Sequence, residues 1–273
     1  MVEAKKSLGQ NFLEDTSYIE RILDAALLGA GEVALEIGPG LGALTFLLTE
    51  RAGQVIAVET DPRFTEILLG ENKKNLTLIE GNILDLDLDT LLASKNIQTK
   101  TYSVIANIPY YITAPIIRRL LALHIQPRQI ILMVQDEVAE RLTAKPGSMS
   151  LLSVMAQYSA TVEKLFFVPR TAFSPVPKVD SAVIKITPRS LVDAKEEKRF
   201  FRIVKAGFQA KRKTLVNNLA NLTGKSKEEL EQILTQLQLR TDIRAQALSI
   251  AEWQQLVDVL SGEETKVEAE SSE

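Results

Sequence analysis

Four consecutive residues, Asn107-Ile108-Pro109-Tyr110, have the types and the spacing to act on an exocyclic amine of a nucleobase. The lone pair of such an amine is delocalised into the ring, so the nitrogen is a poor nucleophile. The carboxamide oxygen of Asn107 and the backbone carbonyl of Ile108 can accept its two N–H groups, which favours the pyramidal geometry needed for in-line attack on a methyl group. Pro109 fixes the local backbone, and the ring of Tyr110 can stack on the base. The alternative is an ordinary strand end with a proline turn.

A glycine-rich stretch nearer the start of the chain could hold the methyl donor. Gly38, Gly40 and Gly42 give the spacing Gly-x-Gly-x-Gly, which differs from the Gly-x-Gly-x-x-Gly of dinucleotide sites. Glycines permit positive φ and let backbone N–H groups approach a ligand closely. Glu36, just before them, suits a ligand that carries positive charge, such as the amino-acid end of S-adenosylmethionine. The alternative is an ordinary glycine-rich turn between a strand and a helix.

The composition offers few side chains that could activate a methyl group for transfer. The chain has no cysteine and one histidine, His124, which we interpret as a surface residue at a helix end. The sequence thus offers no thiolate nucleophile, Ser-His-Asp triad or multi-histidine metal site, and we expect no metal. A sulfonium donor carries its own activation, so proximity and orientation would supply much of the catalysis.

Two further polar residues follow predicted strands. Glu59 lies about 20 residues after the glycines, where folds of this type hold a ribose by its paired hydroxyls. Asn82 follows the next strand. A second aromatic residue, Phe173, lies in a proline-rich loop and could sandwich a base against Tyr110 once the base has left its helical stack. The alternative for Phe173 is packing, because phenylalanine is more often buried.

Alternating strands and helices must position these groups. Runs rich in Val, Ile and Leu predict seven strands, at 33–37, 55–59, 76–80, 102–106, 129–134, 162–168 and 181–186. The helices between them are predicted at 16–28, at 43–48, from Pro62, at 114–123, from Asp136 and at 149–159. This order predicts an α/β fold with a mainly parallel, doubly wound, Rossmann-like sheet, which binds ligands outside the carboxyl ends of its strands.

The character of the chain changes after Pro188. Residues 195–260 contain no strand pattern, and we predict a small all-α domain with helices around 200–208, 214–222, 227–237 and 250–260. The predicted domains are therefore residues 1–190, residues 191–262, and an acidic tail at 263–273 that is too poor in apolar residues to fold.

Charge is distributed unevenly along the chain. The net charge is −3, but residues 263–273 hold five Glu and one Lys, so the remainder carries +1. The segment from Lys164 to Lys213 contains thirteen Lys or Arg residues and only four acidic residues. This excess of positive charge indicates a polyanionic partner. The alternative is a solvated basic face. The candidate phosphate contacts are Lys211, Arg212 and Lys213, extended by Arg118, Arg119 and Lys178.

The N-terminus lacks the apolar run of a signal peptide, and no stretch approaches the roughly 18 apolar residues of a membrane span. We therefore expect a soluble, cytoplasmic protein that does not bind membranes.

With these residues assembled, the chain resembles the ribosomal RNA adenine N6,N6-dimethyltransferases, in particular the small-subunit (16S) enzymes of bacteria. The resemblance runs from about Lys5 to Leu260. It is carried by four segments: Leu8-Gly9-Gln10-Asn11-Phe12-Leu13, Glu36-Ile37-Gly38-Pro39-Gly40-Leu41-Gly42, Asn107-Ile108-Pro109-Tyr110 and Phe173-Ser174-Pro175-Val176-Pro177-Lys178-Val179-Asp180-Ser181. The first and last are more specific than the glycine turn.

The resemblance implies S-adenosylmethionine as donor and two adjacent adenosines near the 3′ end of 16S rRNA as targets, each methylated twice during small-subunit biogenesis. It implies that Asn107 and the Ile108 carbonyl take the target amine, with Tyr110 and Phe173 stacking on the base. The helical domain after Pro188 would help to grip rRNA, and we expect a monomer. The implied cofactor residues are Asn11, Leu13, Gly38, Gly40, Glu59, Asn82 and Asn107.

One position departs from the family pattern. After the third strand the family usually has Gly-Asp, whose carboxylate accepts a hydrogen bond from the donor's adenine amine, whereas this chain has Gly81-Asn82. A carboxamide oxygen still accepts that bond but without charge assistance. We therefore expect weaker donor binding rather than lost activity.

Three other functions remain alternatives. The nearest is the antibiotic-resistance relative that acts on large-subunit rRNA. Another is a non-catalytic RNA-binding assembly factor, against which the intact Gly38, Glu59, Asn107 and Tyr110 argue. The third, an NAD-linked oxidoreductase, is disfavoured by the glycine spacing.

Overall fold

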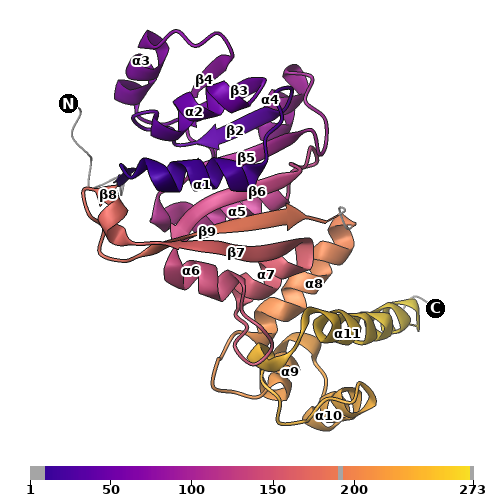
Figure 1. The fold of residues 1–273 in the computed structure, drawn as a ribbon. Helices are drawn as coiled ribbons and strands as arrows, with labels where there is room; N and C mark the ends of the chain where they lie inside the picture. Colours follow the sequence, from indigo (N-terminus) through magenta and orange to yellow (C-terminus); the bar gives the residue numbers. More distant parts are fainter. Residues whose placement is uncertain (1–9, 190–192, 271–273) are drawn as a thin grey trace. The chain divides into compact units, whose positions relative to one another are not determined.

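The computed structural model describes residues 10–189 and 193–270, so Leu8 and Gly9 of the N-terminal motif lie outside it. The chain forms two compact units (Figure 1). The first unit contains the described residues up to Glu140 together with Ala160–Arg189, and the second contains Arg141–Ser159 and the residues from 193 onward. This differs from the single boundary near residue 190 that composition predicts, because residues 141–159 pack with the C-terminal helices.

A seven-stranded sheet in the order β4-β3-β2-β5-β6-β9-β7 forms the centre of the first unit. Its strands are β2 (Val33–Ile37), β3 (Gln54–Glu59), β4 (Leu76–Glu80), β5 (Tyr102–Asn107), β6 (Gln129–Gln135), β7 (Ala160–Val168) and β9 (Ser181–Pro188). The first five pair in parallel, and β9 runs antiparallel to both β6 and β7. The predicted mainly parallel Rossmann-like sheet is confirmed, since apolar runs such as Val55–Val58 are buried on both faces.

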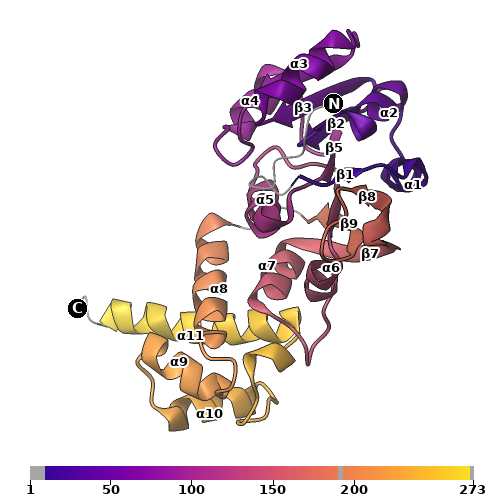
Figure 2. The same cartoon turned by 90° about the vertical axis from the view of Figure 1, so that its left-hand side faces the viewer.

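Helices cover both faces of this sheet. They are α1 (Thr16–Ala26), α2 (Ala43–Arg51), α3 (Pro62–Gly70), α4 (Leu88–Ser94), α5 (Thr113–Leu121) and α6 (Asp136–Leu142). In Figure 2, α1 and α2 lie on one face, and α4 and α5 lie on the other. The side chains of Asp15, Asp61 and Asp87 accept backbone N–H groups at the starts of α1, α3 and α4, which fixes where these helices begin.

The N-terminal segment is tied to the proline-rich loop. Strand β1 (Phe12–Leu13) pairs antiparallel with β8 (Phe173–Ser174), which follows a short 3-10 turn, η3 (Arg170–Ala172). Leu13 and Phe173 are register partners, and both are buried in the apolar cluster beneath α1. The pairing therefore places two sequence motifs from distant parts of the chain side by side.

The second unit is helical. It contains α7 (Leu151–Ser159), α8 (Ala194–Gly207), α9 (Leu215–Thr223), α10 (Lys227–Gln236) and α11 (Ile250–Glu270). Its core is built around the fully buried Trp253, and the ring of Tyr158 on α7 stacks on Phe200 of α8 at 3.9 Å between centroids. No helix in the described part of the chain combines the length and apolar character needed to cross a membrane.

The acidic segment 263–273, predicted from its composition to be disordered, overlaps the end of helix α11. Helix α11 continues to Glu270, and only residues 271–273 lie outside the described residues. The segment 263–270 has neither Gly nor Pro and is rich in Glu, with Lys and Ala, all of which are good helix formers.

Candidate active site

The glycine turn connects β2 to α2 at the carboxyl edge of the parallel strands. Gly38 and Gly42 have φ of 68° and 86°, a region that L side chains rarely adopt. A Cβ at Gly42 would lie 2.6 Å from the Phe46 ring, so this glycine also permits the close approach of α2. A Cβ at Gly38 would meet nothing within 4 Å, and the open space beside it is available to a ligand.

Glu59, at the end of β3, is held against this turn by backbone donors. Its Oε2 accepts the Gly40 N–H at 3.0 Å, and its Oε1 accepts the N–H groups of Thr60 and Asp61, both at 2.8 Å. The carboxylate is buried, yet its unused lone pairs can accept ribose hydroxyls. The structure thus places the Glu59 carboxylate beside Gly40 of the glycine turn.

Glu36 is a buried acid directly before the glycine turn. Its side chain is 2% exposed, and within the described part of the chain its Oε2 has no hydrogen-bond partner. Burial raises the pKa of Glu36 from 4.5 to about 8, the Thr45 hydroxyl opposes this rise, and the charge of Glu59 adds to it. A cationic group bound above the turn would favour the ionised carboxylate. The site therefore fits a ligand with a positively charged portion.

Asn107 and Asn11 lie together at the end of β5. The Asn107 Nδ2 donates to the Asn11 carbonyl at 3.4 Å, which directs the amide N–H toward the N-terminal segment. The Oδ1 of Asn107 remains an acceptor for an incoming amine. Ile108 has a buried side chain, and Pro109 has φ of −58° and ψ of 131°, so the chain is extended where the Ile108 carbonyl precedes the proline.

Tyr110, the last residue of this motif, begins a short 3-10 turn, η2 (Tyr110–Ile112). Its hydroxyl lies 2.6 Å from the Oγ of Ser181, which is fully buried at the start of β9. Burial raises the pKa of Tyr110, and the hydrogen bond with Ser181 opposes the rise. Two anchors, the backbone turn and the hydroxyl, therefore fix the orientation of the ring.

Phe173 is buried, with 2% of its surface exposed, in the cluster that contains Leu13, Val168 and Val183. In this arrangement the ring contributes to packing, which is the alternative that the sequence leaves open. Stacking on a base would require the side chain to turn out of the cluster.

Asn82 follows β4 and is half-buried. Its Oδ1 accepts the Leu84 N–H at 3.1 Å, and its Nδ2 donates to Asp85 Oδ2 at 2.8 Å. Sequence patterns gave no signal for Asp85, because it lies outside every motif in the chain.

The basic residues predicted to bind phosphate fall into different settings. Arg118, Lys178 and residues 211–213 are exposed, the last group in the second unit. Arg119, by contrast, donates to the Leu86 carbonyl and helps to lower the pKa of Asp87, after the larger effect of the Thr90 hydrogen bonds. Its guanidinium is thus engaged in holding the loop before α4, a structural role that the sequence prediction did not include.

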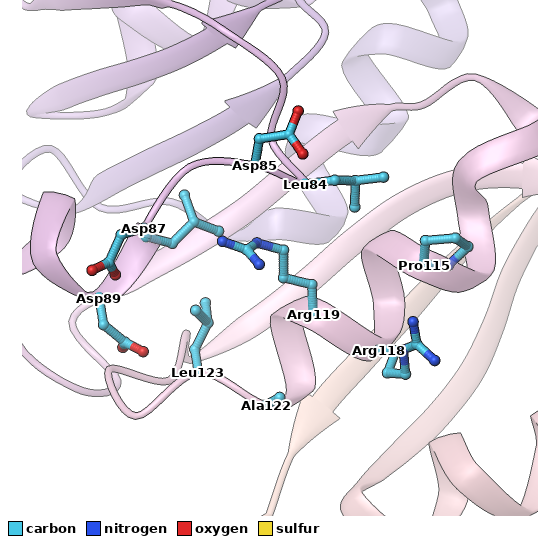
Figure 3. A pocket seen from close by; sticks show the side chains of 10 residues that line it. Leu84, Asp85, Asp87, Asp89, Pro115, Arg118, Arg119, Ala122 and Leu123 are labelled. Carbon is cyan, nitrogen blue, oxygen red and sulfur yellow. The ribbon is translucent and has the colours of Figure 1, made fainter.

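Arg119 also lines a shallow cavity of about 690 Å³ between that loop and α5 (Figure 3). The cavity is lined by Leu84, Asp85, Asp87, Leu88, Asp89, Pro115, Arg118, Arg119, Ala122 and Leu123. His124, just beyond it, is exposed, and its backbone N–H donates to Asp89. Among the described residues no cluster of His, Cys, Asp or Glu could hold a metal ion.

A basic stripe on α8 was missed by the sequence analysis. Its members are exposed at three- or four-residue spacing, which places them on one helix face. They are Lys195, Lys198, Arg199, Arg202 and Lys205. Their helical spacing is visible in the sequence. The net charge of the whole segment 164–213, however, does not distinguish them from the other basic residues in it.

Comparison with known proteins gives a consistent result. A family model described as ribosomal RNA adenine dimethylase matches residues 1–261. The chain is 42% identical over 265 residues to "Ribosomal RNA small subunit methyltransferase A" of Streptococcus thermophilus and 43% identical to the protein of that name from Bacillus mycoides, covering 94% of this chain and 91% of each relative.

Two solved structures are also similar. A dimethyladenosine transferase from Plasmodium falciparum matches with a TM-score of 0.73, covering 90% of this chain and 95% of that one. The 23S rRNA methyltransferase ErmE matches with a TM-score of 0.71, covering 92% and 99%. Both are 26% identical to this chain, so structural likeness alone does not separate small-subunit from large-subunit specificity.

Proposed function

Because the chain belongs to the ribosomal RNA adenine dimethylase family, we propose that it transfers methyl groups from S-adenosylmethionine to N6 of two adjacent adenosines near the 3′ end of 16S rRNA, giving dimethyladenosines. The observation that supports the proposal best is that Gly38, Glu59 and Asn107 lie at one edge of the sheet. Gly38 directly follows β2, and Glu59 and Asn107 are the last residues of its neighbours β3 and β5. Such an edge is where open α/β sheets bind their ligands.

The residues at this edge fit the donor. When bound, S-adenosylmethionine supplies a methyl group on a positively charged sulfur. Glu59 would take the ribose hydroxyls, Asn82 the adenine, and the glycine turn with the buried Glu36 the amino-acid end. The N-terminal segment at Asn11 and Leu13, paired with β8, would cover the site and exclude water.

The target base is held by the motif after β5. The Asn107 Oδ1 and the Ile108 carbonyl would accept the two N6–H groups, which holds the nitrogen with its lone pair directed at the methyl group. The Tyr110 ring, fixed through Ser181, supplies a face on which the base stacks. The adenosine must leave its helical stack to reach this position.

Ribosomal RNA is the proposed partner, with the chain acting as a cytoplasmic monomer in small-subunit biogenesis. The exposed Arg118, Lys178 and residues 211–213, together with the stripe on α8, would contact phosphates without reading sequence. The helical second unit supplies most of these cations, which supports an rRNA-binding role for it.

Methyl transfer from labelled S-adenosylmethionine to unmethylated small and large ribosomal subunits tests the proposal. We expect label in the small-subunit RNA. Label in the large-subunit RNA would assign the chain to the activity named for ErmE. Binding without label in either subunit would indicate a non-catalytic assembly factor.

A further inference from the structure

The carboxamide of Asn82 is held from both sides by groups of opposite hydrogen-bonding character. The Leu84 N–H can only donate, so it faces Oδ1, at 3.1 Å. The Asp85 carboxylate can only accept, so it faces Nδ2, at 2.8 Å. A tight turn produces this arrangement, because the Asp85 N–H donates to the Asn82 carbonyl at 2.9 Å. The amide therefore has one defined orientation.

Among the residues that the structure describes, two hydrogen-bonding positions of the Asn82 side chain have no partner. Oδ1 keeps one lone pair, Nδ2 keeps one N–H, and the residue is only half-buried. Adenine presents a matching pair of groups on its outer edge, since N6 donates and N1 accepts. An asparagine in this orientation can pair with both, whereas an aspartate could only accept.

We propose that Asp85 determines the base specificity of the donor site by locking Asn82 in the orientation that pairs with adenine. This rests on the proposed function, in which Asn82 meets the adenine of S-adenosylmethionine. Asp85 is exposed, and in Figure 3 its carboxyl group points away from the Arg119 guanidinium, which bonds to the Leu86 carbonyl instead. Asp85 would act as a positioning residue, through Asn82.

Hypoxanthine makes the consequence measurable, because its edge is reversed: O6 accepts and N1–H donates. To pair with it, the Asn82 amide would have to turn over. That would set Oδ1 against the Asp85 carboxylate and Nδ2 against the Leu84 N–H, two repulsive contacts. The locked amide should therefore reject a deaminated donor, roughly 10- to 100-fold in affinity.

The test compares the binding of S-adenosylhomocysteine and S-inosylhomocysteine, its deaminated form, by calorimetry on the full chain. The key variant is Asp85→Asn, which is isosteric but can donate as well as accept and so permits the turned amide. We expect it to bind the inosyl compound more tightly than the unmodified protein does, shrinking the preference for adenine several-fold. Asp85→Ala removes the hydrogen-bond acceptor of the Asn82 amide altogether and should reduce the preference for adenine further.

A matched control is Asp87→Asn. It removes the same charge from the same loop but makes no bond to Asn82, and asparagine can still cap α4 through Thr90. Asp87→Asn should keep the full preference for adenine. If Asp85 only stabilised the fold of the loop, its replacement would weaken the binding of both compounds alike. It could not raise the affinity for the inosyl compound.

The outcomes separate the two proposals. Tight binding of S-adenosylhomocysteine with the same preference in the unmodified protein and in Asp85→Asn would overturn the role of Asp85 and leave the proposed function standing. Equal affinity of the unmodified protein for the two compounds would likewise overturn the role of Asp85 and leave the proposed function standing. Failure of the unmodified protein to bind either compound would overturn the proposed donor and, with it, this inference.

Discussion

The hydroxyl of Tyr110 lies 2.6 Å from the hydroxyl of Ser181, and the two residues are 71 positions apart in the chain. Ser181 is fully buried at the first position of β9, which pairs with β6 next to β5. Strand β9, an inner strand of the sheet, thus orients the aromatic ring at the end of the Asn107 motif before any substrate arrives. Preorganisation of this kind lowers the cost of binding a flipped base.

Ser181→Ala should therefore slow methyl transfer without weakening donor binding. Loss of one hydrogen bond predicts a decrease of roughly three- to tenfold in kcat/KM for the ribosomal substrate. Tyr110→Phe removes the other partner of the bond while keeping the ring. If the bond is the cause, the double variant should lose no more than the larger single loss, whereas fully additive losses in kcat/KM would contradict it.

Asn82→Asp would restore the residue that is usual in the family. The loss of charge assistance predicts from sequence that this variant binds the donor more tightly, but the neighbouring Asp85 carboxylate reverses that expectation, and we expect weaker donor binding. It places a second carboxylate at the 2.8 Å contact with Asp85 and removes the hydrogen bond there. The affinity for S-adenosylhomocysteine should fall roughly tenfold. Combining Asn82→Asp with Asp85→Asn reverses the donor and the acceptor and should recover most of the affinity. A gain in affinity from Asn82→Asp alone would contradict this.

Glu36 predicts a pH dependence of stability. Its pKa is about 8 in the folded protein, because of burial first, against 4.5 ordinarily. The folded state then holds one more proton than the unfolded state between these values, so the free energy of unfolding falls as pH rises through that window. Glu36→Gln does not titrate. Its melting temperature relative to the unmodified protein should rise progressively from about pH 5 to about pH 8. A constant difference would argue against a buried neutral Glu36.

Close packing around Gly207 leaves no room for a larger side chain in the core of the second unit. A Cβ there would lie 2.5 Å from the Trp253 ring and 3.0 Å from Leu215. Gly207→Ala should destabilise this unit by about 1–3 kcal/mol. The chain has a single tryptophan, so denaturation followed by Trp253 fluorescence reports on this core. Gly262→Ala is the control, since its Cβ would meet nothing within 4 Å and should not destabilise. Equal effects would contradict the packing argument.

Features set by local sequence were predictable. The parallel strands are short continuous apolar runs, and helices α1 and α3 begin at Thr16 and Pro62, where the sequence predicts them. Helix α4 was missed because it has seven residues, too few to show a helical period.

Features that depend on distant contacts were not predictable. Residues 141–159 join the second unit through contacts such as Tyr158 on Phe200, which no local pattern shows. The burial of Phe173 likewise depends on the pairing of β8 with β1, more than 150 residues away in the chain. The roles of Ser181, Asp85 and Arg119 arise from contacts with neighbours in space or in a turn, while the glycine turn and Asn107 were visible as motifs.

The most direct measurement of the proposed chemistry is mass mapping of small-subunit RNA after incubation with S-adenosylmethionine and either the unmodified protein or Asn107→Ala. We expect two adjacent dimethyladenosines near the 3′ end with the unmodified protein. Asn107→Ala, which lacks the acceptor oxygen, should form them at least about 100-fold more slowly. Asn107→Asp, which keeps an acceptor oxygen, should retain more activity than the alanine variant. Unmethylated adenosines with the unmodified protein, or undiminished methylation by Asn107→Ala, would contradict the proposed mechanism.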